Sequence, residues 1–249
     1  MRKLDRTLAK TPARWSQTAK KAFPNHAKFE KRAQDFQALD INDPVRRAGF
    51  IAYAPDVLPI GGFKSAWGRY KKEIAKISHW QCAYCECTIN AERVGQVEHF
   101  KPKALFPLSA YDWDNYLLAC GGCNGSKSDN WPQAGEYVRP DHPAYAPENH
   151  FQFHAHGDVD WLNAEAEHTI KDFDLKRQLL VNDRKMFLDV VEFQIKLIVK
   201  IGKTDEAEAL QVADELWLRL NDPQRYPYST ALRQYASIAL KQALPGFSI

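Results

Sequence analysis

Two C-x-x-C pairs constrain the fold of this chain more than any other feature of its sequence. Cys82 pairs with Cys85 and Cys120 with Cys123, and a two-residue gap lets both thiolates of a pair face one ion. Two such pairs complete a tetrahedral sulfur site suited to structural Zn2+, which we favour over redox chemistry or coincidence. The two glycines inside the second pair are expected to let the backbone turn tightly around the metal. Cys87 lies outside both pairs and is interpreted as a spare thiol.

The length and composition allow a buried core and indicate a compartment. The chain has 249 residues, of which 45% are hydrophobic, and this is long enough to bury a sizeable core. An apolar run of about 18 residues is absent from the sequence, so no membrane span is expected. The opening MRKLDRTLAK lacks the apolar segment of a secretory signal. We therefore expect a cytoplasmic protein, in which five cysteines, an odd number, favour metal binding over disulfides.

Positive charge is concentrated near the N-terminus. Residues 1–36 contain ten Lys or Arg side chains against three acidic ones, a net charge of +7, although the whole chain carries only +3. Such a basic arm suits a phosphate backbone, to which affinity comes largely from counterion release. A solvated surface helix with lysine-rich faces is an equally good interpretation of the charge alone.

Apolar residues at helical spacing predict helices on both sides of the cysteine region. The expected helices cover residues 26–39, a segment from Trp67 to Ile77, and C-terminal segments around 187–198, 210–220 and 232–239. We expect an α+β fold with a basic, mainly helical region (1–78), a core (79–131) and a second, mainly helical region (132–249).

The residues between the cysteine pairs carry the candidate chemistry. The pairs lie roughly 35 residues apart, whereas a simple two-pair zinc ribbon has about 15 to 20, so a further unit is expected between them. Val97 and its neighbours predict a strand that delivers Glu98 and His99, and residues 117–119 predict a second strand. Residues 124–127 predict the start of a helix. The order is therefore strand, loop, strand, helix.

This region resembles the HNH endonuclease family, whose ββα-metal core often carries a four-cysteine zinc clamp. The resemblance covers about residues 80–130 and rests on C-x-x-C, E-H, D-N-x-x-x-x-C-x-x-C-N and the following G-S-K. It implies that His99 is the general base, that Asn115 orients His99 through its loop, and that Glu98 and Asn124 hold a catalytic Mg2+ or Mn2+. The sequence departs from the commonest pattern in having Glu at 98 in place of Asp and Asn at 124 in place of the final His. Both substitutes still offer oxygen to a hard cation.

The implied reaction explains the residue types. A phosphodiester repels nucleophiles and has a poor leaving group, so its hydrolysis needs a base and a cation. A histidine with an unperturbed pKa of about 6.5 can accept a proton near neutral pH. Lys127 is expected to contact phosphate, and Lys101 and Lys103 lie close to the base in sequence; ordinary solvated lysine is an equal alternative for them.

A narrower resemblance covers most of the chain. The opening MRKLDR, the basic N-terminal region, the HNH-like centre, and HFQFHAHGDVD followed by AEHTIKDFDL look like the PtuB-type HNH nucleases of Septu and retron anti-phage systems. This resemblance implies an antiviral nuclease that works with a PtuA-like ATPase, with the C-terminal helices as docking surfaces, and cuts DNA. Two alternatives stay open: an RNA nuclease with the same site, for example against tRNA, and a non-catalytic zinc-ribbon module that binds nucleic acid or protein.

Overall fold

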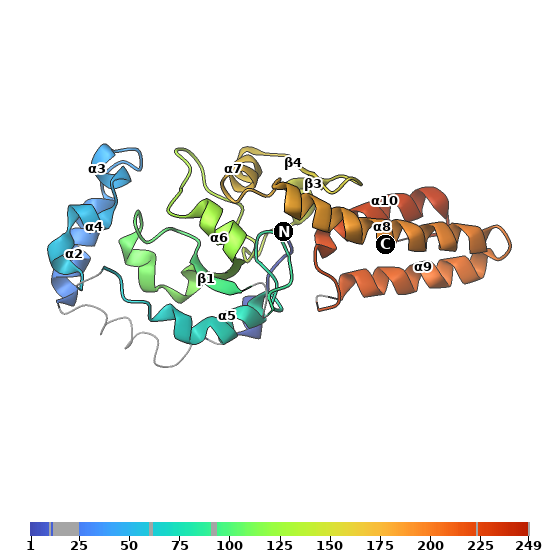
Figure 1. Ribbon diagram of the computed structural model, residues 1–249, viewed down its shortest axis with the longest axis horizontal. Coiled ribbons are helices and arrows are strands. Elements are labelled where there is room, and N and C mark those ends of the chain that lie inside the picture. Colours follow the sequence, from blue (N-terminus) through green and yellow to red (C-terminus); the bar gives the residue numbers. More distant parts are fainter. Residues whose placement is uncertain (10, 12–24, 60–61, 91–93, 223, 249) are drawn as a thin grey trace.

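The computed structural model describes residues 1–9, 11, 25–59, 62–90, 94–222 and 224–248. It is an elongated α+β molecule, with short helices at one end, two small sheets in the middle and three long helices at the other end (Figure 1). The mixture of helices and small sheets confirms the expected fold class. Short 3-10 turns connect the larger elements, at Arg6–Leu8, Pro55–Val57, Trp67–Tyr70, Pro107–Tyr111, Trp113–Asn115 and Pro147–Asn149.

The first sheet lies at the centre of the molecule. Strand β1 (Gly95–His99) pairs antiparallel with β2 (Tyr116–Cys120), in a register that places His99 opposite Tyr116. Every residue of β2 is buried, because its YLLAC sequence offers apolar side chains to both faces. Helix α6 (Gly121–Lys127) follows β2 directly. The two strands lie where the sequence predicted them, whereas the helix begins at Gly121, three residues before its predicted start at Asn124.

The N-terminal helices pack on one another through aromatic side chains. Helix α2 (His26–Gln37) confirms the first predicted helix, and it is followed by α3 (Pro44–Arg47) and α4 (Phe50–Tyr53). The rings of Phe29 and Phe36 both meet Phe50 edge-on, at 5.6 and 5.3 Å between centroids. The segment predicted from Trp67 to Ile77 is a 3-10 turn that continues into α5 (Lys71–Ile77).

The C-terminal half combines a hairpin with a three-helix unit. Strands β3 (Phe151–Phe153) and β4 (Val159–Trp161) pair antiparallel and lead into α7 (Ala164–Asp172). The apolar stripes predicted helices that the structure confirms as α8 (Gln178–Gly202), α9 (Glu206–Asn221) and α10 (Ser229–Ala243). These three helices bury a core of their own, whereas residues from Met1 to Leu180, with Tyr228, share one larger core.

Many described basic residues of the N-terminal segment have internal partners. Arg2 donates through Nε to Ser229 Oγ at 3.1 Å, and Arg6 pairs with Asp141. Lys28 and Arg32 both pair with Asp56. Four of the ten basic residues in the proposed phosphate-binding arm lie outside the described part of the chain: Lys10, Arg14, Lys20 and Lys21. None of the helices in the described ranges is both long enough and apolar enough to cross a bilayer.

Candidate metal centre and histidine pocket

The four paired cysteines converge at one point. Cys82 and Cys85 lie in the loop after α5, Cys120 ends β2, and Cys123 lies in the first turn of α6. All four side chains are buried, and their Sγ atoms lie within 4.8 Å of one another. A tetrahedral zinc–thiolate site with Zn–S bonds of 2.3 Å requires sulfurs about 3.8 Å apart, and Cys85 Sγ lies 3.8 Å from Cys120 Sγ. The four cysteines could therefore bind a zinc ion.

Arg177, which directly precedes α8, covers this centre and was not predicted from the sequence. Arg177 Nη2 lies 3.8, 3.7 and 3.6 Å from the sulfurs of Cys85, Cys120 and Cys123. A guanidinium in this position would balance the net negative charge of a Zn2+ ion bound by four thiolates. No local motif marks Arg177, because it reaches the centre from 54 residues after the last cysteine.

The glycines of the second pair have a different role from the one expected. Neither Gly121 nor Gly122 has a positive φ, so the backbone conformation there does not require glycine. A Cβ atom at position 122 would instead lie 3.2 Å from Arg177 Nη2. Gly122 therefore makes room for the guanidinium. Cys87 is buried beside the centre but does not belong to the four-sulfur group.

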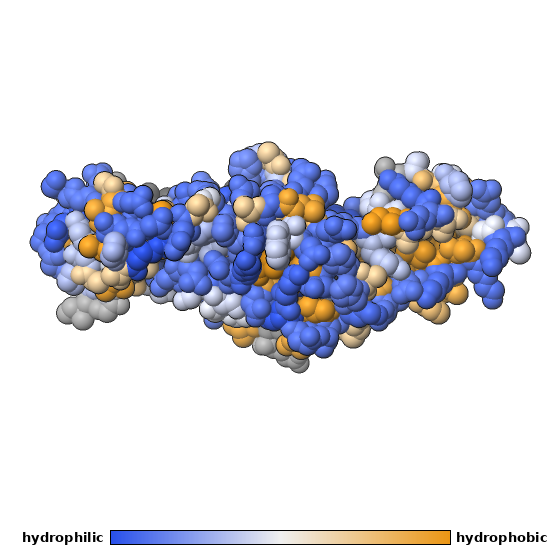
Figure 2. Space-filling model, turned by 90° about the horizontal axis from the view of Figure 1, so that it is seen from above, coloured by the Kyte–Doolittle hydropathy of each residue, from blue (hydrophilic) through white to orange (hydrophobic). Residues whose placement is uncertain are grey.

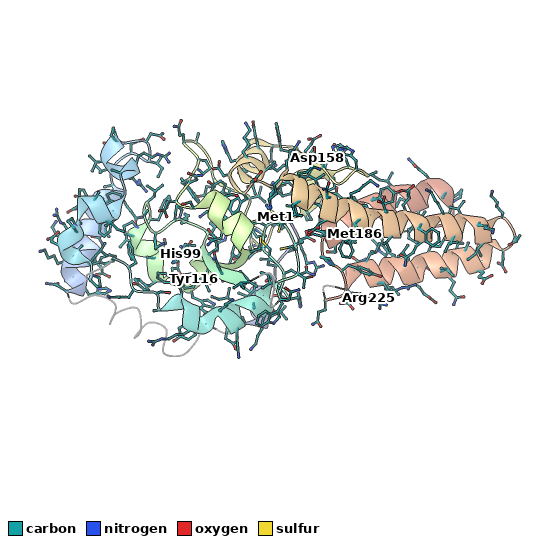
Figure 3. The ribbon with its side chains drawn as sticks, viewed as in Figure 1. Met1, His99, Tyr116, Asp158, Met186 and Arg225 are labelled. Carbon is teal, nitrogen blue, oxygen red and sulfur yellow. The ribbon has the colours of Figure 1, made fainter. Side chains whose placement is uncertain are left out.

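A pocket of about 420 Å3 brings the other predicted residues together. It opens between the Trp67 turn, β1 and the end of α6, and Figure 3 labels His99 on its β1 wall. Its lining includes Glu98, His99, Asn124 and Lys103 from the sequence prediction. The sequence analysis missed other lining residues: Ser65, Trp67, Gly68, Lys71, Gln96, Val97, Pro102, Ser128 and Asp129.

His99 is held by one hydrogen bond and two aromatic rings. Its Nε2 atom lies 3.0 Å from the carbonyl oxygen of Ala110. A carbonyl only accepts, so Nε2 carries the proton and Nδ1 keeps the lone pair. Trp67 and Tyr116 meet the imidazole edge-on, at 4.5 and 5.1 Å between centroids. Figure 3 labels His99 and Tyr116 side by side. Burial, followed by the nearby charge of Lys103, lowers the pKa of His99 to about 3, so the ring is neutral at physiological pH.

Asn115 is buried and fixes the loop that carries Ala110. Its Oδ1 accepts from the backbone N–H of Lys101 at 2.8 Å. Its Nδ2 donates to the carbonyls of Lys101 and Ser109, at 2.9 and 3.0 Å. Because Ala110 follows Ser109 and holds His99, these bonds connect Asn115 to the orientation of the imidazole. Asn115 does not line the pocket.

Glu98 and Lys127 are placed differently from the sequence expectation. Lys127 Nζ lies 2.5 Å from Glu98 Oε1 and donates to the carbonyl of His99 at 2.8 Å. Glu98 Oε2 accepts from the Tyr84 hydroxyl at 2.7 Å. Both carboxylate oxygens therefore have partners, and the pair is almost completely buried. In this arrangement Lys127 does not line the pocket, and a cation at Glu98 would have to share the carboxylate with Lys127 and Tyr84.

The remaining predicted residues divide between the pocket and the surface. Asn124 lies on the pocket wall and donates through Nδ2 to Gln96 Oε1, which leaves its own amide oxygen for other partners. Lys103 lines the pocket with its ammonium 5.9 Å from the Trp67 ring centre. Lys101 instead pairs with Glu136 at 3.5 Å. Within the described residues, the four cysteines form the only group of three or more His, Cys, Asp or Glu donors arranged for a metal.

The fold and the site define an α+β protein that joins a four-cysteine, zinc-type centre to a pocket with a neutral histidine. No family model matches the chain. It is similar to the Septu protein PtuB of Bacillus thuringiensis, with 33% identity over 91 residues, which is 35% of each chain. It is also similar to the Septu protein PtuB of Bacillus mycoides (strain KBAB4), with 22% identity over 221 residues, 69% of this chain and 75% of that protein. The first match thus spans about a third of its relative's length.

Proposed function

We propose that this protein is an HNH-type endonuclease that hydrolyses phosphodiester bonds in DNA and serves as the nuclease of a Septu-like anti-phage system. The observation that carries the proposal is the pocket, in which His99 presents a neutral imidazole beside Asn124 and Lys103. Residues 79–131 would form the nuclease core, stabilised by zinc, and the flanking regions 1–78 and 132–249 would support it and hold partners.

His99 acts as the general base in this proposal. The Ala110 carbonyl fixes the proton on Nε2, so Nδ1 is the atom that would accept a proton from an attacking water. The pKa of about 3 makes His99 a weaker base than a solvated histidine, and the negative charge of a phosphate in the pocket would raise that pKa. Asn115 is a positioning residue, because its three side-chain hydrogen bonds hold the loop on which Ala110 lies. This proposed role does not require Asn115 to line the pocket.

Two lysines that line the pocket, Lys71 and Lys103, are the candidates for phosphate binding. Lys127 takes a different role from the one expected, since it is buried and joins Glu98 to the backbone of His99. Lys101 pairs with Glu136 outside the pocket lining, so we assign it no contact with substrate.

HNH nucleases use a catalytic Mg2+ or Mn2+, which supplies positive charge to the scissile phosphate and the leaving 3′ oxygen. Asn124 would offer its amide oxygen to this ion, and Asp129, on the same pocket wall, would offer a carboxylate. Glu98 fits the ion poorly while Lys127 and Tyr84 occupy its oxygens. The roles of His99, Asn115 and the lysines do not depend on which oxygens hold the cation.

The relatives' names support the biological context. Both similar proteins are named as PtuB components of Septu, and on this basis we propose a PtuA-like ATPase as a partner of the chain.

A plasmid-nicking assay tests the proposal. The purified protein, with its ATPase partner where the chain alone is inactive, should nick plasmid DNA in Mg2+ or Mn2+ but not in EDTA. His99→Ala should lose at least a hundredfold in rate, the typical contribution of a general base, and should keep the zinc content of the parent and a cooperative unfolding transition, at a lower temperature because a buried ring is lost. His156→Ala, an exposed histidine on the β3–β4 hairpin, is the matched control and should cut normally.

Three outcomes would contradict the proposed DNA nuclease activity or its mechanism. Normal cutting by His99→Ala would show that His99 is not the general base. Nucleic-acid binding without cutting in any metal would favour a non-catalytic zinc-ribbon module. Cleavage of tRNA but not of the plasmid would keep the site and change the substrate to RNA.

A further inference from the structure

Helix α8 has two apolar faces, and only one of them is covered in the structure. The covered face packs on α9 and α10 through Leu188, Val191, Ile195 and Ile198. The other carries five large apolar side chains that are each between 47% and 70% exposed, an exposed stripe made of Leu179, Met186, Val190, Phe193 and Leu197. In Figure 2 apolar atoms gather over the end of the molecule formed by these helices. Contiguous apolar surface of this kind marks an interaction site, whereas single exposed apolar residues are ordinary.

The spacing of the exposed stripe is that of a helix–helix seam. Its members follow one another at intervals of seven, four, three and four residues, the alternation of a and d positions in a heptad. The stripe extends about 27 Å along the helix, at 1.5 Å per residue. Asp183 occupies the one seam position in this span that is not apolar, and it accepts a hydrogen bond from Tyr228 in the same chain.

We propose that a second copy of this chain covers the exposed stripe, with the two α8 helices antiparallel about a twofold axis that passes between Val190 and Phe193. In that pairing Val190 faces Phe193 of the second copy, and Met186 faces Leu197 of the second copy. Four of the five stripe residues thus meet one another across the axis, whereas Leu179 faces position 204, beyond the end of α8. Self-complementary contacts of this kind are what a symmetric dimer interface requires.

The charges beside the exposed stripe favour this orientation. Asp189 and Lys196 lie on the same edge of the stripe, one heptad apart, and both side chains are exposed. In an antiparallel pair, Asp189 of each copy lies opposite Lys196 of the other, so the attraction occurs twice. A parallel, in-register pair would instead place like charges at the same level. Within one copy, Lys185 already pairs with Asp189 and Glu192 with Lys196, so the contacts between copies would extend these pairs into a network.

Sedimentation of the purified full chain over about 1 to 100 µM tests the proposal, since a dimer with a dissociation constant within this range changes from monomer to dimer across it. The parent chain should be a dimer at the upper end of the range. Phe193→Asp should weaken dimerisation at least tenfold, as loss of a central aromatic contact does. Leu218→Asp, on α9 and equally apolar and exposed but outside the exposed stripe, should leave the dimer unchanged. Unchanged melting temperatures would show that both variants fold.

Charge reversal tests the antiparallel orientation. Asp189→Lys and Lys196→Asp should each weaken self-association, because each places like charges opposite one another across the seam. An equal mixture of these two single variants should associate as the parent does, because the mixed pair restores both attractions between the copies. A monomeric parent, a dimer that survives Phe193→Asp, or a mixture that stays monomeric would each overturn the proposal. A monomer whose ATPase binding is lost in Phe193→Asp would also overturn it and assign the exposed stripe to that partner.

Discussion

At the scale of single residues, the ion pair between Glu98 and Lys127 is the most consequential contact near the pocket. Removing two charges from water costs free energy, which this pair offsets with the Tyr84 hydroxyl and the His99 carbonyl as additional partners. The second of these contacts connects the end of α6 to the backbone of the proposed base. Lys127 therefore supports the position of His99 without being available to substrate.

Replacing Lys127 by Met should leave the buried Glu98 carboxylate without its counter-charge. We expect the free energy of unfolding in urea to fall by about 3 to 5 kcal/mol, the cost of breaking a buried pair from one side. The double variant Glu98→Gln/Lys127→Met should recover most of the loss, because neither charge is then buried. Lys101→Met is the matched control: its pair with Glu136 is exposed and should contribute less than about 1 kcal/mol. A similar small effect at Lys127 would show that the pair is not formed in solution.

At the scale of elements, the sequence predicted the central strands and the longer helices but not α3, α4, α7 or β4, and it predicted few of the contacts between elements. The residues around Val97 and the run before Cys120 were enough to locate β1 and β2, because local pattern determines these strands. Helix α6 begins three residues before its predicted start, because the Cys120 side chain caps it by accepting from the Cys123 N–H. The partner of Glu98 was not predictable in this way, because it depends on which side chain of α6 faces β1. The same holds for Arg177, which meets the cysteines only through the packing of α8 on the core.

Arg177 joins two elements, since it lies at the N-terminus of α8 and contacts sulfurs at the end of β2 and the start of α6. Arg177→Met should bind zinc more weakly by about 10- to 100-fold, as loss of a hydrogen-bonding partner around a metal site typically does. Competition with a chromogenic chelator measures this directly, without reference to nuclease activity. Arg177→Lys should be intermediate, because it keeps the positive charge but loses the planar fork whose other arm donates to the carbonyls of Phe173 and Asp174. Lys176→Met, which removes only surface pairs with Asp158 and Asp160, should bind zinc as the parent does.

At the scale of the whole molecule, the N-terminal segment is built into the core. Leu4 donates its backbone N–H to the carbonyl of Pro140 at 2.8 Å, and the Tyr145 hydroxyl donates to the Met1 carbonyl. The larger core includes Met1 and Leu4 together with residues on both sides of the cysteine centre. The sequence suggested the N-terminal basic residues as a phosphate-binding arm. Two of them, Arg2 and Arg6, instead bond to other parts of the folded chain. Net charge alone could not separate these two uses.

Asp141 provides a test of this attachment through pH. Burial would raise its pKa, but hydrogen bonds from Arg139 and the charges of Arg6 and Arg139 outweigh burial and lower it. The pKa of Asp141 in the folded state lies below the unfolded value of about 3.9. The ionised carboxylate therefore stabilises the folded state fully above about pH 3.9, and this contribution is lost as the pH falls through the folded-state pKa. Asp141→Asn should therefore be less stable than the parent by about 3 kcal/mol at pH 7. The difference in unfolding free energy should stay constant down to about pH 5 and narrow below it. A difference that already shrinks between pH 7 and pH 6 would assign the effect to a group that titrates near neutrality, such as a histidine, and not to this carboxylate.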